Sequence, residues 1–289
     1  MRRHLNFAFA FCILASTAVG ASGGARAADI AVKAPVYKAP PVAVSDWTGW
    51  YVGLNAGGAI NNSRYELDPT GCFLTGCGVG GVAANPNRTF FGKFNNAAFT
   101  GGGQVGYNWQ VGTWLWGLET DINYDGLNQT NSANVILTGP LTGGNTLTAV
   151  SQRLDWFGTV RGRVGFVPSP TWLLYATGGL AYGHVSSGTN VLFPLTCCGG
   201  DNYVGNGSTV RAGWTVGGGG EWMFMQNWSI KAEYLYVNLG SLTYADPCIT
   251  PTAVCGTPFP TYSTRISTRE HIARLGINYH FGAPVVAKY

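Results

Sequence analysis

Glu119 and Asp121 lie two residues apart in WLWGLETDINY (residues 114–124), one of the most aromatic runs of the chain. Paired carboxylates serve general acid–base catalysis and metal binding. A spacing of two is also the period of a β-strand, which places both side chains on one face. The pair therefore has three possible interpretations: a catalytic site, a metal site, or the polar face of a strand.

The histidines give little support to catalysis. A serine hydrolase needs a Ser and a His within hydrogen-bond reach, together with an orienting acid. His271 has Ser267 four residues earlier and Glu270 beside it, and we interpret these residues as a solvated strand end. His184 and His280 have no Ser neighbour in sequence that suggests a nucleophile. With no phosphate-binding loop either, we expect no enzyme activity and no cofactor.

The amino-terminal segment has the features of an export signal. Two arginines precede a mostly apolar stretch at residues 7–19, and the A-x-A form of a signal-peptidase site ends at Ala27. We predict a signal peptide over residues 1–27; a retained membrane anchor is the alternative, for which the apolar stretch is short. Cleavage removes three arginines and no acid, so the formal charge falls from +4 to +1. The charge therefore gives no support to a nucleic-acid partner.

The six cysteines beyond this signal fall in three close pairs: Cys72 and Cys77, Cys197 and Cys198, and Cys248 and Cys255. An exported chain meets an oxidising compartment, so we predict local disulfides for the first and third pairs. The adjacent pair would form a strained bridge or pair elsewhere. Zinc is the alternative, but no pair has a nearby His with ligand spacing, so we expect no metal site.

The remaining composition favours an all-β chain. Charged residues are only 10% of the sequence, against ~25% in soluble domains, while Gly is 43 of 289 residues and aromatics are 13%. After a Pro- and Ala-rich linker at 28–46, eight segments alternate with period two, which predicts strands. They are residues 47–60, 99–110, 114–124, 154–166, 172–183, 212–223, 228–239 and 271–281.

The connections between these segments alternate in length. Short ones at 111–113, 167–171 and 224–227 alternate with long ones at 61–98, 125–153, 184–211 and 240–270. Barrels of the outer membrane have short periplasmic turns and long external loops. We therefore predict an all-β fold, an eight-stranded antiparallel up-and-down transmembrane β-barrel with four long external loops and short periplasmic turns. The barrel would cover residues 47–281, with a tail at 282–289.

The two faces of the strands differ in chemistry. One carries Trp114, Trp116 and many other large apolar residues, too many for a surface in water, which argues against a lipocalin-like carrier. The other is small and polar, and its opposite charges are expected to pair inside a narrow lumen, as a structural or gating network. These residues are Glu119, Asp121, Asp155, Arg161, Arg163, Glu221, Lys231, Glu233 and Arg274. Within the network, we expect Glu119 and Asp121 to pair with Arg161 and Arg163.

Several motifs follow one another along the chain: WTGWYVGLNAGGAI, WFGTVRGRVGF, YATGGLAYG, WTVGGGGEW, KAEYLYVNLG and RLGINYHF. Together they resemble the small outer-membrane β-barrel proteins (porin family, opacity-like) of rhizobial and related alphaproteobacteria. The resemblance implies residence in the outer membrane of a Gram-negative bacterium, among its lipids and lipopolysaccharide. It also implies insertion by the barrel-assembly machinery, which would read Tyr279 and Phe281 in the last strand, although the chain continues to Tyr289.

The resemblance bears on function in two further ways. In some members the mature chain starts with Ala-Asp and is joined covalently to peptidoglycan, and Ala28 and Asp29 match that start; an ordinary signal-peptidase cut is the alternative. We expect a structural outer-membrane protein that contributes to envelope integrity and cell-surface contact. Porin-like diffusion of small solutes and adhesion by the long loops are the alternatives.

Overall fold

The computed structural model describes residues 43–44, 46–71, 89–136, 145–193, 201–250, 261–281 and 285–286. Within these ranges, no helix has the length and apolar character needed to cross a membrane. The strands are β1 (Ala43–Val44), β2 (Gly49–Asn61), β3 (Arg64–Thr70), β4 (Phe90–Lys93), β5 (Ala97–Val111), β6 (Trp114–Ile136), β7 (Asn145–Ser169), β8 (Trp172–Leu192), β9 (Asn202–Met225), β10 (Trp228–Pro247), β11 (Thr261–His280) and β12 (Val285–Val286).

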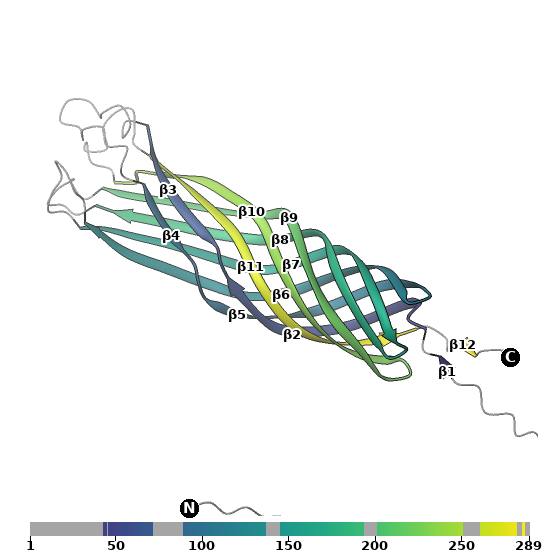
Figure 1. The fold of residues 1–289 in the computed structure, drawn as a ribbon. Helices are drawn as coiled ribbons and strands as arrows, with labels where there is room; N and C mark the ends of the chain where they lie inside the picture. The colour runs from purple at the N-terminus through teal and green to yellow at the C-terminus, as the bar shows by residue number, and fades with distance from the viewer. Residues whose placement is uncertain are drawn as a thin grey trace, which may run out of the picture. The chain divides into compact units, whose positions relative to one another are not determined.

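Eight of these strands close into a barrel. β2 pairs antiparallel with β5, each of β5 to β10 pairs antiparallel with the strand that follows it, and β11 also pairs with β2, which closes the ring (Figure 1). The ring therefore has no free edge in this part, which satisfies the backbone hydrogen bonds of a sheet surrounded by lipid. The predicted eight-stranded antiparallel barrel is confirmed. The short strands β1 and β12 pair with each other.

The strands run further than the sequence pattern predicted. β6 to β11 have 20 to 25 residues each, so much of what we expected to be long loops is sheet. β3 continues the line of β2 along β11, pairing with residues 261–267 of that strand. In these extensions, for example SSGTN (residues 186–190), both faces of the strand carry small polar residues. The alternation of polar and apolar residues that identifies a strand is therefore too weak to be recognised.

The short turns join neighbouring strands at one end of the barrel. They consist of residues 112–113, 170–171 and 226–227. In the first, Gly112 has a φ of 63°, a left-handed conformation that Gly adopts without steric cost. We call this end the turn side and the opposite end the loop side.

The outer wall is apolar between two aromatic belts. At the turn side, Trp172 stacks on Trp222, with ring centroids 6.0 Å apart. At the loop-side belt, Trp156 packs against Tyr182 with centroids at 6.1 Å. Trp172 and Tyr182 are ten residues apart on β8, roughly 33 Å along a strand and about 25 Å along the normal of a tilted barrel, the height of a lipid-facing band. Leu180, 64% exposed, lies between them.

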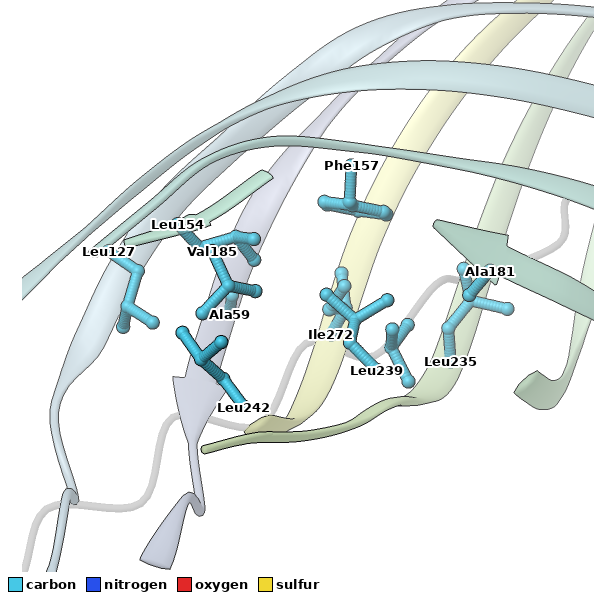
Figure 2. Packing of buried hydrophobic residues seen from close by; sticks show 11 residues of the cluster. Ala59, Leu127, Leu154, Phe157, Ala181, Val185, Leu235, Leu239, Leu242 and Ile272 are labelled. Atoms are coloured by element: carbon cyan, nitrogen blue, oxygen red, sulfur yellow. The ribbon is translucent and has the colours of Figure 1, made fainter. Parts of the chain in front are cut away.

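The interior is built in layers along the strands. β8 contributes Leu173 to an apolar turn-side cluster, then small residues beside the charged side chains, and then Ala181 and Val185 to a middle apolar cluster (Figure 2). Val191 belongs to a third cluster beyond it. The charged network predicted for the lumen therefore occupies one layer, between the turn-side and middle apolar clusters, and further buried polar residues such as Gln152 and Asp246 lie beyond it.

Candidate functional site

The charged layer is positioned by the register of five strands. Glu119 on β6 lies directly opposite Arg161 on β7. On the other side of the barrel, Glu233 on β10 faces Arg274 on β11. Opposite charges in direct cross-strand positions attract one another at the closest approach that a sheet allows. Glu221 of β9 lies opposite Lys231 of β10 in the same way.

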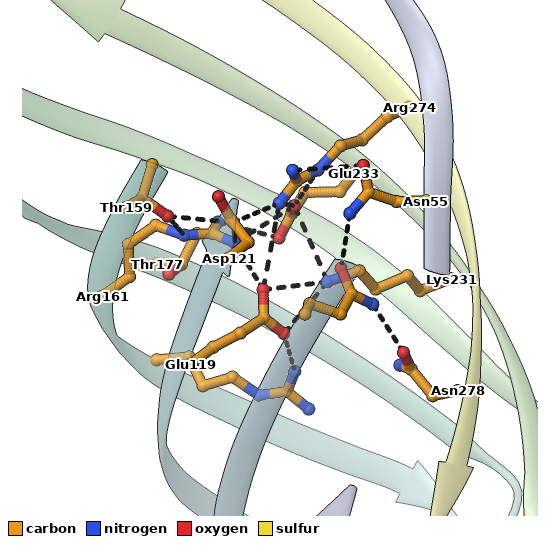
Figure 3. Close-up of polar contacts among 12 residues, drawn as sticks. Asn55, Glu119, Asp121, Thr159, Arg161, Thr177, Lys231, Glu233, Arg274 and Asn278 are labelled. Atoms are coloured by element: carbon orange, nitrogen blue, oxygen red, sulfur yellow. Dashed lines mark hydrogen bonds and ion pairs between the residues drawn. The ribbon is translucent and has the colours of Figure 1, made fainter. Parts of the chain in front are cut away.

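Arg161 is the centre of the layer (Figure 3). Its Nη2 contacts Glu119 and lies 2.9 Å from Asp121 Oδ2, and its Nη1 lies 3.0 Å from Glu233 Oε1. Its Nε donates to Thr159 Oγ1 at 2.9 Å. One guanidinium therefore joins carboxylates of β6 and β10, which lie on different parts of the ring, and fixes their side chains across the lumen.

Arg163 occupies the turn side of the same layer. It forms ion pairs with Glu119 and Glu221, each at 3.2 Å. Its guanidinium lies between two aromatic rings, 5.0 Å from the centroid of Tyr51 and 4.7 Å from that of Tyr175. Tyr51 in turn donates to Glu119 Oε2 at 2.6 Å. Tyr51 thus packs against the cation and hydrogen-bonds its partner Glu119, while Tyr175 packs against the cation and donates to Glu233 Oε1 at 2.9 Å.

Lys231 and Arg274 complete the contacts from β10 and β11. Although Lys231 faces Glu221 in register, its Nζ lies 2.9 Å from Glu119 Oε1 across the lumen. Arg274 Nη2 lies 2.8 Å from Asp121 Oδ2 and 2.6 Å from Glu233 Oε2. Both cations therefore contact an acid of β6, and Arg274 also contacts its cross-strand neighbour Glu233.

The layer contains four acids and four bases, so its formal charges balance. Their side chains are at most 1% exposed. Each carboxylate lies within ion-pair distance of at least one cation, and the interior of an eight-stranded barrel is only wide enough to be filled by side chains. Such carboxylates have neither room nor free valence for a substrate. Among the described residues, no three His, Cys, Asp or Glu side chains are grouped to hold a metal ion.

Asp155 is the exception among the nine predicted network residues, and that prediction is wrong. The register of β7 and β8 shifts between Leu154 and Phe157, so both of these residues point inward. A bulge of this kind places one extra residue on the outer side and reverses the alternation before it. Asp155 therefore lies on the wall, where it pairs with Arg153 at 2.5 Å and with His184 at 2.8 Å.

The other residues singled out by the sequence are spread over the molecule. The predicted solvated strand end at Ser267, Glu270 and His271 is wrong, because these residues lie within β11: Glu270 is buried and faces the interior, and His271 lies on the outer wall, where it contacts Tyr234 Oη at 2.6 Å. Tyr279 packs edge-on against Phe281 at the end of β11, with centroids 5.1 Å apart. Cys248 is disulfide-bonded. Ala28, Asp29, Cys72, Cys77, Cys197, Cys198 and Cys255 lie outside the described residues.

Further polar residues belong to the two clusters but not to the predicted network. The alternation of the sequence places Tyr51 and Tyr175 on the charged face, but the predicted network contained only charged side chains. His184 lies between Asp155 and Ser208 Oγ, the latter at 3.0 Å from its Nε2. These three residues come from β7, β8 and β9, and nothing in the linear sequence indicates that they meet.

Comparisons with known proteins agree with this architecture. The family described as "Outer membrane protein beta-barrel domain" matches residues 30–281. The 31 kDa outer-membrane immunogenic protein of Brucella melitensis biotype 1 is 33% identical, over 93% of this chain and 98% of the relative. The 22 kDa outer membrane protein of Rhizobium leguminosarum bv. viciae is 31% identical, over 57% of this chain and 64% of the relative.

Among solved structures, the outer membrane protein OprG of Pseudomonas aeruginosa covers 82% of this chain and 98% of its own. Its sequence is 12% identical and its TM-score is 0.43, so the likeness supports no conclusion about this chain. The family match and the Brucella relative span nearly the whole barrel, with the alternation and closure described above. The chain therefore belongs to the outer membrane protein β-barrel family and resides in the outer membrane of a Gram-negative bacterium.

Proposed function

We propose that the protein is a structural component of the outer membrane, contributing to envelope integrity and to contact at the cell surface. The observation that carries the proposal is the filled lumen. Eight charged side chains from five strands occupy one layer, and apolar clusters lie on either side of it. A barrel closed in this way offers a rigid wall rather than a passage for solutes.

The network supports this role energetically. Leaving a buried charge without its partner costs about 3–5 kcal/mol, so the four acids and four bases stabilise only the arrangement in which all are paired. Strands β6, β7, β9, β10 and β11 must therefore be in register together. The network thereby specifies the closed ring as well as filling it.

A covalent link to peptidoglycan would extend the mechanical role across the periplasm. The proposal rests on the Ala28-Asp29 start of the expected mature chain and on the linker at 28–46. Mass spectrometry of peptides released by muramidase tests it, because a linked Ala28 carries a muropeptide on its amine. A free Ala28 amine in every molecule would exclude the link.

Single-channel recording in planar bilayers tests the closed lumen. The wild-type barrel is expected to show no large, stable conductance steps. Arg161→Ala combined with Arg163→Ala removes two of the four cations, so we expect lower resistance to heat unfolding in detergent and a higher conductance. Arg153→Ala is the matched control, since this arginine of β7 lies on the outer wall with 63% of its side chain exposed.

The recordings also separate the structural role from solute diffusion. Large, stable steps from the wild-type barrel would favour a porin-like function and overturn the proposal. A double variant with unchanged heat resistance and unchanged conductance would show that the charged layer neither closes nor stabilises the barrel.

A further inference from the structure

A second polar cluster lies on the outer wall, where lipid rather than water is the neighbour. His184 uses both of its ring nitrogens: Nδ1 lies 2.8 Å from Asp155 Oδ2, and Nε2 lies 3.0 Å from Ser208 Oγ. In serine hydrolases the acid binds one ring nitrogen and fixes the tautomer, while the other nitrogen accepts the serine proton. The cluster has this division of roles, with each contact at hydrogen-bond distance.

The other histidines of the described chain, His271 and His280, lack this division of roles between the two ring nitrogens. His280 contacts Ser229 and Glu221 through the same nitrogen, Nε2, and is buried inside the barrel. A single ring nitrogen cannot be held by the acid and accept the proton of the serine at the same time. His271 contacts the hydroxyl of Tyr234 instead.

The sheet positions the three side chains by two local features. The bulge in β7 places Asp155 on the outer side, beside the position of His184 on β8. His184 lies opposite Val210 of β9, and Ser208 is the next residue along the same face, diagonal to the imidazole. Diagonal neighbours on one face of a sheet are within reach of long side chains. Bulges are frequent beside active sites because they re-aim a side chain in this way.

The groups around the cluster provide a place for a substrate. A groove of about 450 Å³ runs beside Ser208, and its lining includes Asn128, Arg153, Ser186 and Asn206. Ser186 Oγ lies 2.9 Å from Ser208 Oγ. The Arg153 guanidinium contacts the second carboxylate oxygen of Asp155 and is 63% exposed. Ser186 thus offers a hydroxyl next to the nucleophile, where negative charge would develop, and Arg153 adds a cation to the lining of the same groove.

The cluster lies at the depth of lipid esters. Trp156 and Tyr182 of the loop-side belt are its immediate neighbours in sequence and on the wall. Trp and Tyr collect at the membrane interface, between hydrocarbon and headgroups, which is also where ester carbonyls of lipids lie. The side chains of His184 and Asp155 are 32% and 26% exposed, and Ser208 is exposed, so a lipid can approach all three.

From this geometry we propose that Asp155, His184 and Ser208 form a serine hydrolase site that cleaves acyl esters of outer-leaflet lipids. Ser208 Oγ attacks the ester carbonyl as its proton passes to His184 Nε2, and Asp155 stabilises the imidazolium. The tetrahedral intermediate collapses, the ester bond breaks, and His184 returns the proton to the departing alcohol. Water, deprotonated by His184, then attacks the acyl-serine; the bond between the acyl carbon and Ser208 Oγ breaks, His184 returns the proton to Oγ, and a fatty acid is released. The activity is additional to the structural role.

The test uses the folded, full-length barrel in mixed micelles, with free fatty acid measured by mass spectrometry. One arm contains phospholipid and the other lipopolysaccharide, so the arm that releases fatty acid identifies the source of the ester. A fluorophosphonate probe gives a second readout, a covalent adduct on Ser208. We expect Ser208→Ala to lose the adduct and to release fatty acid at least about 1,000-fold more slowly.

Folding is checked for every variant by a band that shifts on boiling in detergent gels. Ser132→Ala, an exposed serine of β6, is the matched control and keeps both the wild-type release and the adduct. Release from either lipid that depends on Ser208 supports the proposal. Release equal in the wild type and Ser208→Ala, or no release from either lipid by the folded wild type, overturns it.

Discussion

The barrel contains two clusters of charged and polar side chains that differ in what surrounds them. Inside, Arg161 has four partners, and the acids and bases of its layer are at most 1% exposed. On the wall, His184 has one contact at each ring nitrogen and remains 32% exposed beside a groove. A saturated cluster in a filled lumen can only hold the fold, whereas a partly open one at the lipid interface can act on a substrate.

The largest expected effect comes from breaking the inner cluster. Glu119→Ala removes the partner of Arg161, Arg163 and Lys231 and leaves these cations buried with too few acids. We expect the free energy of unfolding to fall by about 3–5 kcal/mol, measured by urea titration with the heat-shifted gel band as readout. Glu66→Ala on β3, outside the network, is the control. An equal, small effect for both variants would contradict a structural role for the layer.

The next effect concerns the wall between the belts. Ala176→Arg puts a charge on the apolar band, four residues from Trp172 and six from Tyr182 on β8, where the cost near the bilayer midplane is about 2–4 kcal/mol. We expect that loss in lipid vesicles. Asn128→Arg, on the same outer side but beyond the loop-side belt, should be nearly neutral. If both arginines had the same effect, the position of the lipid band would be wrong.

A smaller effect is expected at Asp246, which lies on β10 beyond the loop-side belt. Burial raises the pKa of this carboxyl to about 6. Because the folded pKa exceeds the unfolded one, the ionised group costs stability above pH 6, and the protein gains stability as the pH falls from 6 towards 4. Asp246→Asn should therefore increase the free energy of unfolding at pH 8 by about 1–2 kcal/mol and change it little at pH 4. Equal gains at both pH values would exclude titration as the cause.

The smallest effect on stability is expected on the wall. The pair of Asp155 with Arg153 is partly exposed, and such pairs contribute about 0–1 kcal/mol. Asp155→Asn should therefore leave the unfolding curve almost unchanged while release of fatty acid falls by about 10³–10⁴-fold. A large loss of stability with unchanged hydrolysis would reverse the assigned roles of the two clusters.

The sequence was sufficient for features that follow from alternation alone. A period of two put Glu119, Asp121 and Arg161 on one face, and alternating connection lengths indicated eight strands. The bulge at residues 154–157 could not be foreseen, because one extra residue in a strand leaves no mark in composition. That shift is why Asp155 was placed in the lumen.

Contacts across the lumen could not be predicted from the sequence, for a second reason. Lys231 faces Glu221 in register but reaches Glu119 on a distant strand, which depends on the curvature of the ring rather than on sequence order. The apolar layers were missed for a related reason. Leu235 and Val237 continue the inward face of β10 after Glu233, and they form a buried cluster only because the barrel extends beyond the charged layer. The meeting of Asp155, His184 and Ser208 requires the register of three strands at once.

The central claim is that the charges inside the barrel act as one structural unit. A double-mutant cycle on Glu119 and Arg161, with each changed to Gln, measures it directly through the free energy of unfolding in lipid. If the pair is coupled as the contacts indicate, the double variant will differ from the sum of the single variants by about 0.5–3 kcal/mol. Strict additivity, with each substitution costing little, would contradict the claim.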